Sequence, residues 1–344
     1  MKIIKFSVLS VLGLIVILEI ILRVGYFEQL KTQKFPLIYQ PDSILGYTHI
    51  RNVKAQICRP SIDKKFSLNN HGFIGNDFTL TKAKGEIRIA VVGNSMTEGI
   101  WYDSVENYTM KLQKLFLNKG YKEVKIINCS YGGIDKDLRN YLHIKKYVSK
   151  FNPDIILFNV GIPFHNDNEV RENYKNYMIR YANGSKWSRQ KAIEMVERLI
   201  EKKGFIFLYN LSYIFRAYCK NYCENNYGEF RDNISTYREN SSSAPDILTY
   251  QYSLQTSIKL LSDLNTSLKN NNITLIVWPF NIDQGIEKLL KENRILFVDL
   301  NISFQKSMIY KHDEHPNEMG HIEIARSLYP KLREKLEELN LIKN

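Results

Sequence analysis

The chain has 344 residues, of which 44% are hydrophobic and 24% charged, and this ordinary balance excludes a wholly disordered protein. Its length fits one large domain or two small ones. The formal net charge of +12 comes from lysines and arginines spread along the chain, so it indicates solvated faces beside an anionic surface and selects no substrate.

The first 23 residues predict a helix that spans a membrane. They are uncharged over residues 6–18 and remain apolar beyond that run except at Glu19, which is close to the length that crosses a bilayer. No small residues of the kind that mark a cleavage site follow, so we expect an uncleaved signal anchor over residues 1–27. Lys2 and Lys5 favour a cytoplasmic N-terminus, a single pass through the cell membrane and a body on the extracytoplasmic side, where nucleic acid is not an expected partner.

Glu19 and Arg23 lie four positions apart on one face of this predicted helix, so their side chains can pair. Such a pair either keeps both charges at the water boundary or contacts another helix, and the sequence leaves both open. We expect the first, because a charge costs less near the outer interface than at the membrane midplane.

Residues 28–84 predict a stalk and an irregular lead-in, because Asn, Asp, Gly and Pro are frequent there, and the core is expected to begin at residue 85. Over residues 85–344, apolar runs alternate with amphipathic stretches. This pattern predicts an α/β fold, a flavodoxin-like three-layer sandwich around a doubly wound, parallel, five-stranded sheet. The expected strands are residues 86–93, 124–130, 153–161, 273–280 and 295–300, and the expected helices 105–118, 137–151, 283–292 and 317–339, the last kinked or split at Pro330.

An insertion over about residues 166–271 separates the third and fourth strands, is predicted to be helical and carries 11 of the 22 tyrosines. It forms either a lid over a binding site or a packed layer that completes the core. Within it, Cys219 and Cys223 lie four positions apart, which allows either a disulfide or two core thiols. The sequence lacks paired Cys-x-x-Cys motifs, so a structural metal site is not expected. No other cofactor is expected either.

Polar residues follow the carboxyl ends of the predicted strands, where ligands bind to an open parallel sheet. Ser95 comes directly after the first strand, and Gly132 and Gly133 follow the second, where a backbone N–H can approach an oxyanion. Asp313 and His315 lie after the last strand. A serine, a base and an acid with backbone donors nearby are the components of nucleophilic acyl transfer, although a serine at a helix start is by itself more often a cap.

At these residues the chain resembles the SGNH hydrolases, a superfamily of GDSL-like esterases and acyltransferases, and in particular its membrane-anchored bacterial members. The segment "GNSMTEG" is similar to the family's first sequence block, a glycine of "YGGID" to the second, and "DEHPNEMGH" to the last. The resemblance implies Ser95 as the nucleophile, His315 as the general base and Asp313 as its partner. It also implies an oxyanion hole formed by the backbone amides of Ser95 and of Gly132 or Gly133.

The sequence departs from the family pattern in three places. Asn94 stands where the family usually has Asp. Only one residue separates Asp313 from His315 where two are commonest, and His312 occupies the alternative position. The third block, G-x-N-D, is missing from its usual place, so we hypothesise that Asn166 of the segment "HND" supplies the oxyanion donor that this block would provide.

These features predict a membrane-anchored serine esterase or O-acyltransferase that acts on ester groups, above all acetyl groups, of cell-envelope glycans. The substrate class follows from the resemblance and the predicted location, since no residue of the sequence identifies the acyl chain or the sugar. Two alternatives stay open: a catalytically weak binding or scaffolding module in envelope-glycan assembly, and a lipase or lysophospholipase that acts on membrane lipids.

Overall fold

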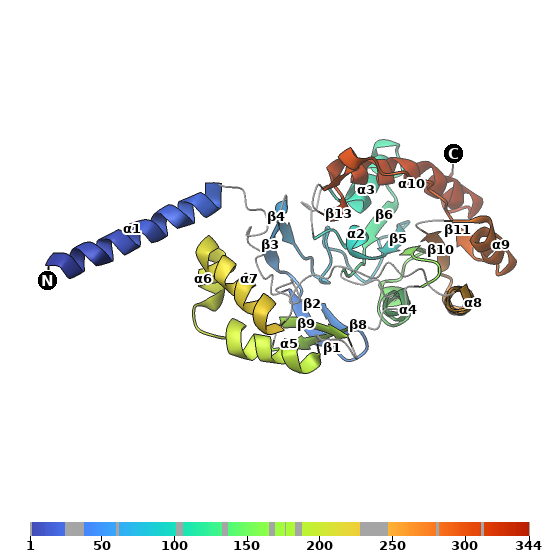
Figure 1. Ribbon diagram of the computed structural model, residues 1–344. Helices are drawn as coiled ribbons and strands as arrows, with labels where there is room; N and C mark the ends of the chain where they lie inside the picture. Colours follow the sequence, from blue (N-terminus) through green and yellow to red (C-terminus); the bar gives the residue numbers. More distant parts are fainter. Residues whose placement is uncertain are drawn as a thin grey trace. The chain divides into compact units, whose positions relative to one another are not determined.

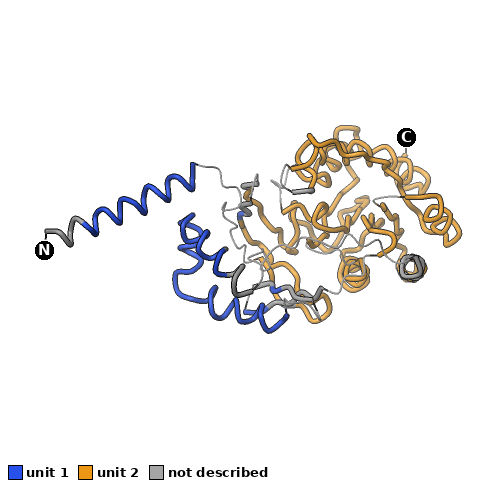
Figure 2. The backbone as a smooth tube through the Cα atoms, in the orientation of Figure 1, with its two compact units in different colours: residues 1–37, 56–63, 168–239 blue, residues 38–55, 64–167, 240–344 orange. Residues whose placement is uncertain are grey.

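The computed structural model describes residues 2–24, 38–59, 62–100, 106–132, 137–164, 169–175, 177–182, 188–227, 247–279, 282–310 and 313–343. The chain divides into two compact units (Figure 2). Unit 1 comprises residues 1–37, 56–63 and 168–239, and unit 2 comprises residues 38–55, 64–167 and 240–344. The expected division into an anchor, a lead-in and a domain with an insertion stays a prediction.

Unit 2 is built on a parallel sheet of five strands, as the sequence predicts. In space the strands follow the order β11-β10-β7-β5-β6, which is the doubly wound order of flavodoxin-like folds. Every residue of β5 and β7 is buried, because helices cover both faces of such a sheet. The strands are β5 (Ile87–Val92), β6 (Val124–Asn128), β7 (Ile155–Val160), β10 (Thr274–Pro279) and β11 (Leu296–Phe297), the last shorter than the expected residues 295–300.

Helices form the outer layers of unit 2 (Figure 1). The pair α3 (Tyr108–Asn118) and α10 (Glu318–Glu338) pack together on one face, and α4 (Asp137–Lys146) and α8 (Ile247–Lys269) contact each other on the opposite face. A short helix, α9 (Gln284–Glu292), lies beside β11. The sequence predicts a kink or a split at Pro330. The helix α10 is not split, because it runs through Pro330 as one helix, and its apolar stripe enters the core.

The lead-in contributes to the core of unit 2, contrary to the expected start of the core at residue 85. The hairpin of β1 (Tyr39–Asp42) and β2 (Gly46–His49) buries Tyr47, and the following turns bury Phe73. A second pair, β3 (Lys54–Arg59) and β4 (Ile62–Ser67), follows. Alternate apolar residues of such short strands are hard to recognise among turn-forming residues, which explains the wrong expectation.

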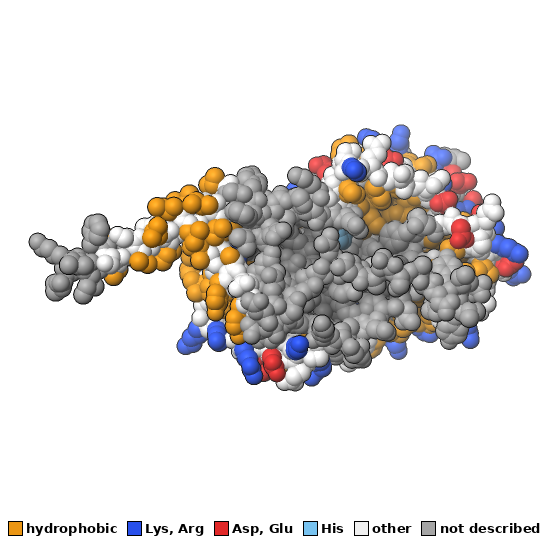
Figure 3. All heavy atoms as spheres, in the orientation of Figure 1, with side chains coloured by type: hydrophobic (Ala, Val, Ile, Leu, Met, Phe, Trp, Pro, Cys, Tyr) orange, Lys and Arg blue, Asp and Glu red, His pale blue; other side chains and the backbone are white. Residues whose placement is uncertain are grey.

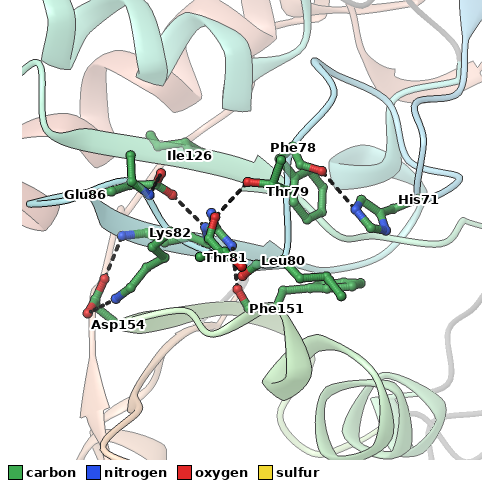
Figure 4. Close-up of polar contacts among 12 residues, drawn as sticks. His71, Phe78, Thr79, Leu80, Thr81, Lys82, Glu86, Ile126, Phe151 and Asp154 are labelled. Carbon is green, nitrogen blue, oxygen red and sulfur yellow. Dashed lines mark hydrogen bonds and ion pairs between the residues drawn. The ribbon is translucent and has the colours of Figure 1, made fainter.

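A polar network fixes the amino end of the central strands (Figure 4). The buried guanidinium of Arg88 donates to Glu86 at 2.7 Å and to the carbonyl of Phe151 at 2.7 Å. Asp154 accepts the backbone N–H of Arg88 at 2.7 Å and pairs with Lys82 at 2.6 Å. This network lies at the strand end opposite Ser95 and therefore stabilises the sheet rather than a binding site.

Unit 1 contains the N-terminal helix α1 (Lys2–Val24) and most of the predicted insertion. The sequence predicts helices in the insertion, but the structure also has an antiparallel hairpin of β8 (Glu169–Tyr174) and β9 (Tyr177–Ala182). Four helical segments follow: α5 (Arg189–Met195), the π-helix η4 (Val196–Ile200), α6 (Phe205–Leu211) and α7 (Tyr213–Tyr227).

These segments of unit 1 share a small core that includes Val196, Phe205 and Cys219. Cys219 is a free thiol, and burial raises its pKa to about 12. The side chain of Cys223, its candidate disulfide partner, lies outside the described residues.

Candidate active site

Ser95 begins a single-turn helix, α2 (Ser95–Glu98), directly after β5. Asn94 is the N-cap of this helix, and its side chain accepts the backbone N–H of Met96 at 3.1 Å. The Ser95 hydroxyl is therefore not used as the helix cap. This arrangement separates the two interpretations that the sequence leaves open for Ser95.

Three side chains, from the start of α3 and the end of β6, hold α2 in place. The carbonyl oxygen of Thr97 accepts the amide N–H groups of Asn107 at 3.0 Å and of Asn128, the last residue of β6, at 2.7 Å. The buried Tyr108 hydroxyl donates to the Thr97 hydroxyl at 3.1 Å. Gly93 allows the turn to pass, because a Cβ there would lie 2.3 Å from the Thr97 hydroxyl oxygen. Two amide donors thus satisfy a carbonyl that the end of a short helix would leave unpaired.

His315 lies far from Ser95 in the sequence but contacts it in the fold. It lies on β13 (Asp313–Pro316), a short strand that pairs antiparallel with β12 (Ile309–Tyr310). The Ser95 Oγ lies 2.7 Å from the His315 Nε2, although the two residues are 220 positions apart in sequence. This distance is within the 2.6–3.2 Å that proton transfer from a hydroxyl to a base requires.

The segment after His315 anchors its strand to α10. Asn317 is the N-cap of α10 and accepts the backbone N–H groups of Met319 and Gly320. Its own amide group donates to the carbonyls of Ser307 at 2.8 Å and Ile309 at 3.2 Å. Ser307 and Met308 belong to the 3-10 helix η5 (Lys306–Met308). Each of these contacts limits the movement of the strand that carries His315.

Two further positions of the same segment bring α10 close to its neighbours. A Cβ on Gly320 would lie 2.5 Å from the carbonyl oxygen of Met308, so only glycine permits this approach. The buried His321 accepts the backbone N–H of Tyr108, the first residue of α3, at 3.0 Å. An accepting imidazole nitrogen must be unprotonated, and burial lowers the pKa of His321 to about 3, with the nearby Lys111 charge acting in the same direction.

Gly132 follows β6 and contacts α2 through a buried carboxylate. A Cβ on Gly132 would lie 1.7 Å from Oε2 of Glu98, and the Tyr47 hydroxyl donates to the Gly132 carbonyl at 3.2 Å. Oε1 of Glu98 lies 3.0 Å from Nε2 of His49, off the line of a linear hydrogen bond, and both side chains are buried. The buried acid and imidazole thus set the space available to Gly132.

The second ring nitrogen of His49, Nδ1, contacts a backbone carbonyl, and this contact determines that Nδ1 carries a hydrogen. Its Nδ1 lies 2.8 Å from the carbonyl oxygen of Gly72, and a carbonyl can only accept, so Nδ1 carries a hydrogen.

The structure thus brings together Ser95 and His315 and places Gly132 against the last residue of α2. Gly133 and Asn166 lie outside the described residues, as does the side chain of Asp313. Within the described ranges, no group of three or more His, Cys, Asp or Glu side chains is arranged to hold a metal ion.

Sequence reasoning missed the residues that support α2, namely Asn107, Asn128, Glu98 and His49. Asn128 could have been identified, because it ends a predicted strand and therefore lies at the expected rim. Tyr47 and His49 are alternate residues of β2, and both are buried. This alternation is the only local signal for the pairing of His49 with Glu98.

No protein-family model and no curated protein matches the chain. Several solved structures are similar to it. The crystal structure of TesA is 10% identical and covers 72% of this chain and 98% of its own, with a TM-score of 0.39. For a catalytic mutant of Axe2, an acetylxylan esterase from Geobacillus stearothermophilus, the identity is 12%, the coverage 74% and 96% and the TM-score 0.37.

The lipase/acylhydrolase from Enterococcus faecalis is 10% identical and covers 72% of this chain and 96% of its own, with a TM-score of 0.38. Similarity at this level carries no argument about function, so the chemistry has to be inferred from the residues of the site.

Proposed function

We propose that the chain is a serine esterase or O-acyltransferase in which Ser95 is the nucleophile and His315 the general base. The observation that carries this proposal is the 2.7 Å contact between Ser95 Oγ and His315 Nε2 at the carboxyl end of β5. A contact between a capped helix and a remote strand needs many supporting interactions, and the amides of Asn107, Asn128 and Asn317 supply them.

In the proposed reaction, the Ser95 oxygen attacks the ester carbonyl carbon while His315 accepts the hydroxyl proton. The negative charge that develops on the carbonyl oxygen is stabilised by the backbone N–H groups of Ser95 and Gly132, with Gly133 and Asn166 as further candidate donors. His315 then returns the proton to the leaving alcohol. Water or a sugar hydroxyl releases the acyl group from Ser95, with the base acting again in the same way, and Asp313 is the proposed partner that orients His315.

The proposed substrates are acetyl esters of cell-envelope glycans. Two features support this choice: the motifs resemble those of membrane-anchored SGNH proteins, and α1 contains a stretch, Ser7–Val24, that is long and apolar enough to cross a bilayer. In this proposal α1 is an uncleaved anchor, and the reaction takes place outside the cytoplasmic membrane.

A fluorophosphonate probe tests the nucleophile. We expect the full chain to be labelled and Ser95→Ala to lose labelling. The control is Ser149→Ala, which removes an exposed hydroxyl far from Ser95 in the sequence and should be labelled like the parent. Hydrolysis of a soluble acetyl ester by Ser95→Ala should fall by at least about 1,000-fold, as for other serine nucleophiles. Absence of labelling in a parent chain with native helix content would contradict the proposal and favour a non-catalytic scaffold.

Chain-length preference tests the substrate class. We expect acetylated oligosaccharides and short acetyl esters to react, and esters of long acyl chains to react much more slowly. The reverse preference would indicate a lipase. Addition of an unacetylated glycan separates the two remaining reactions, because an acyltransferase forms an acetylated acceptor whereas an esterase releases only acetate.

A further inference from the structure

In unit 1, the helix α1 contacts α7 through the Glu19–Arg23 pair. Tyr213 and Ile214 are the first two residues of α7. Glu19 accepts the backbone N–H of Tyr213 at 2.9 Å and the backbone N–H of Ile214 at 3.1 Å. It also accepts the Ser212 hydroxyl at 3.0 Å. The carboxylate therefore occupies the N-terminus of α7, where a negative charge is favourable.

Arg23 binds the other half of the same helical hairpin. It donates to Glu19 at 2.9 Å and to the carbonyl of Leu211, the last residue of α6. Its guanidinium also lies over the ring of Tyr213, 5.4 Å from the centroid. The expected pairing of Glu19 with Arg23 is confirmed, and the pair contacts another helix instead of only facing water. The two charges complement both helix ends at the α6–α7 junction.

These contacts fix the position of the α6–α7 junction along the axis of α1. Glu19 lies five residues before Val24, the end of the apolar stretch, which corresponds to about 7.5 Å along the helix axis. Interfacial helices bury their apolar face about 5–10 Å below the headgroup boundary. If α1 crosses a bilayer, the α6–α7 junction therefore lies at the depth of an interfacial helix.

The outward face of α6 is apolar. Phe205 and Tyr209 of α6 enter the core of unit 1, whereas Phe207, Leu208 and Leu211 are exposed by 67%, 43% and 52%. Figure 3 shows hydrophobic side chains gathered along α1 and on the helices beside its C-terminal part.

Charged and aromatic residues flank this apolar face. The residues before α6, Lys202 and Lys203, are exposed, and so is the ring of Tyr218 on α7. Exposed apolar residues together with lysines and an exposed tyrosine are the composition of a helix that lies in a membrane interface.

From the depth of the junction and the composition of this face, we propose that the α6–α7 hairpin docks on the lipid bilayer, with Phe207, Leu208 and Leu211 inserted into the leaflet from which α1 emerges. The membrane contact then consists of a spanning helix and a helical hairpin held to it by Glu19 and Arg23. This proposal rests on α1 being an uncleaved anchor, as in the proposed function, but not on the esterase chemistry. The hairpin would also give unit 1 one orientation at the membrane surface.

Quenching of tryptophan fluorescence by brominated lipid tests the depth of α6. The full chain is placed in vesicles of phosphatidylcholine and phosphatidylglycerol with bromine on the acyl chains near the ester. Phe207→Trp is compared with Phe304→Trp, an exposed phenylalanine of unit 2, and the signal of the parent chain with its 3 tryptophans is subtracted from each. We expect the bromine to quench Phe207→Trp at least about twofold more than Phe304→Trp, because an interfacial helix buries its apolar face.

Flotation of the same vesicles separates the two ways in which the proposal can fail. A chain that does not float with the lipid has no anchor, and that result overturns the membrane location together with the hairpin. A chain that floats, with Phe207→Trp quenched no more than Phe304→Trp, overturns the hairpin docking and leaves the anchor intact. Fluorophosphonate labelling of Ser95 reports the esterase chemistry independently of both results.

Glu19→Leu, combined with Phe207→Trp, tests the contact that holds the hairpin. It makes α1 more apolar, so anchoring should not weaken, but it removes the acceptor at the N-terminus of α7. We expect the extra quenching to fall towards the level of Phe304→Trp. Gly13→Leu is the matched control, because it adds an apolar side chain to α1 where a Cβ meets nothing within 4 Å, and it should leave the quenching unchanged. Unchanged quenching in the Glu19→Leu variant would overturn the role of this contact.

Discussion

At the scale of single residues, Asn94 separates capping from catalysis. Its side chain caps α2, so the neighbouring Ser95 keeps its hydroxyl for His315. Aspartate, the residue usual in the resembling family, would make the same hydrogen bond. The departure from the family pattern therefore preserves the local structure.

Substitutions of Asn94 test this interpretation. Asn94→Asp keeps an acceptor for the N–H of Met96, so we expect the melting temperature and the rate of Ser95 labelling to stay near those of the parent. Asn94→Ala loses the acceptor, which typically costs about 1 kcal/mol, and should slow labelling because α2 loses its first hydrogen bond. Equal labelling rates in both variants would show that the cap does not position the nucleophile.

Also at the scale of single residues, the effect of a substitution at Gly132 depends on the side chain of Glu98. Gly132→Ala places a methyl group 1.7 Å from Oε2 of Glu98, so the carboxylate has to leave its position beside His49. Overpacking of this kind costs about 1–3 kcal/mol. In the background of Glu98→Ala the same methyl group has room, so its cost in unfolding free energy should largely disappear. Additive effects of the two substitutions would contradict the contact.

At the scale of elements, the start of α10 connects the site to the core. Asn317 fixes the strand of His315, Gly320 allows the close approach to η5, and His321 accepts a hydrogen bond from the first residue of α3. One short segment thus holds β13, α3 and α10 together. The residues of "HPNEMGH" after the histidine have structural roles, which motif comparison alone does not reveal.

The pH dependence of stability tests the α3–α10 junction. The folded-state pKa of His321, about 3, lies below the ordinary value of about 6.5, so its contribution is fully present above pH 6.5 and is lost as the pH falls towards 3. Each extra proton bound on unfolding gives a slope of about 1.4 kcal/mol per pH unit. His321→Gln should lower the slope of unfolding free energy between pH 4 and 6 by up to that amount. An unchanged slope would exclude His321 as the titrating group.

His143 provides an independent measurement of the same kind. Its ring donates to the carbonyl of Cys129 at 2.9 Å, and burial lowers its pKa to about 3 as well. We expect His143→Gln to reduce the same slope, and the double variant with His321→Gln to reduce it further. The two histidines lie in different contacts, so their effects should add.

At the scale of the whole molecule, we expect unit 1 to depend on α1, which contacts α7, and the sheet of unit 2 not to depend on it. Deletion of residues 1–24 removes Glu19 and Arg23 from the ends of α7 and α6. We therefore expect faster amide hydrogen exchange in peptides of α6 and α7 and unchanged exchange in β5, β6 and β7. Glu19→Ala in the full chain should reproduce the effect on α7. Protection of α7 that survives both changes would contradict the dependence.

The sequence alone determined the strands of the sheet and its doubly wound, parallel class. Apolar runs bounded by turn-forming residues identify β5, β6, β7 and β10, because strand burial leaves a local, readable pattern. The alternation of strands and helices then allows few topologies. The same rule placed Ser95 and His315 at one edge of the sheet, since both follow strands whose carboxyl ends meet there.

Only the tertiary structure decided which side chains meet. The contact of Ser95 with His315, the buried pair of Glu98 with His49 and the docking of Glu19 on α7 each join residues that are far apart in sequence. Such contacts depend on the exact approach of separate elements, and no local periodicity encodes that approach. The sequence analysis also missed the hairpin of β8 and β9 and the buried part of the lead-in. Their short strands are stabilised mainly by the residues that pack against them, which the sequence does not show.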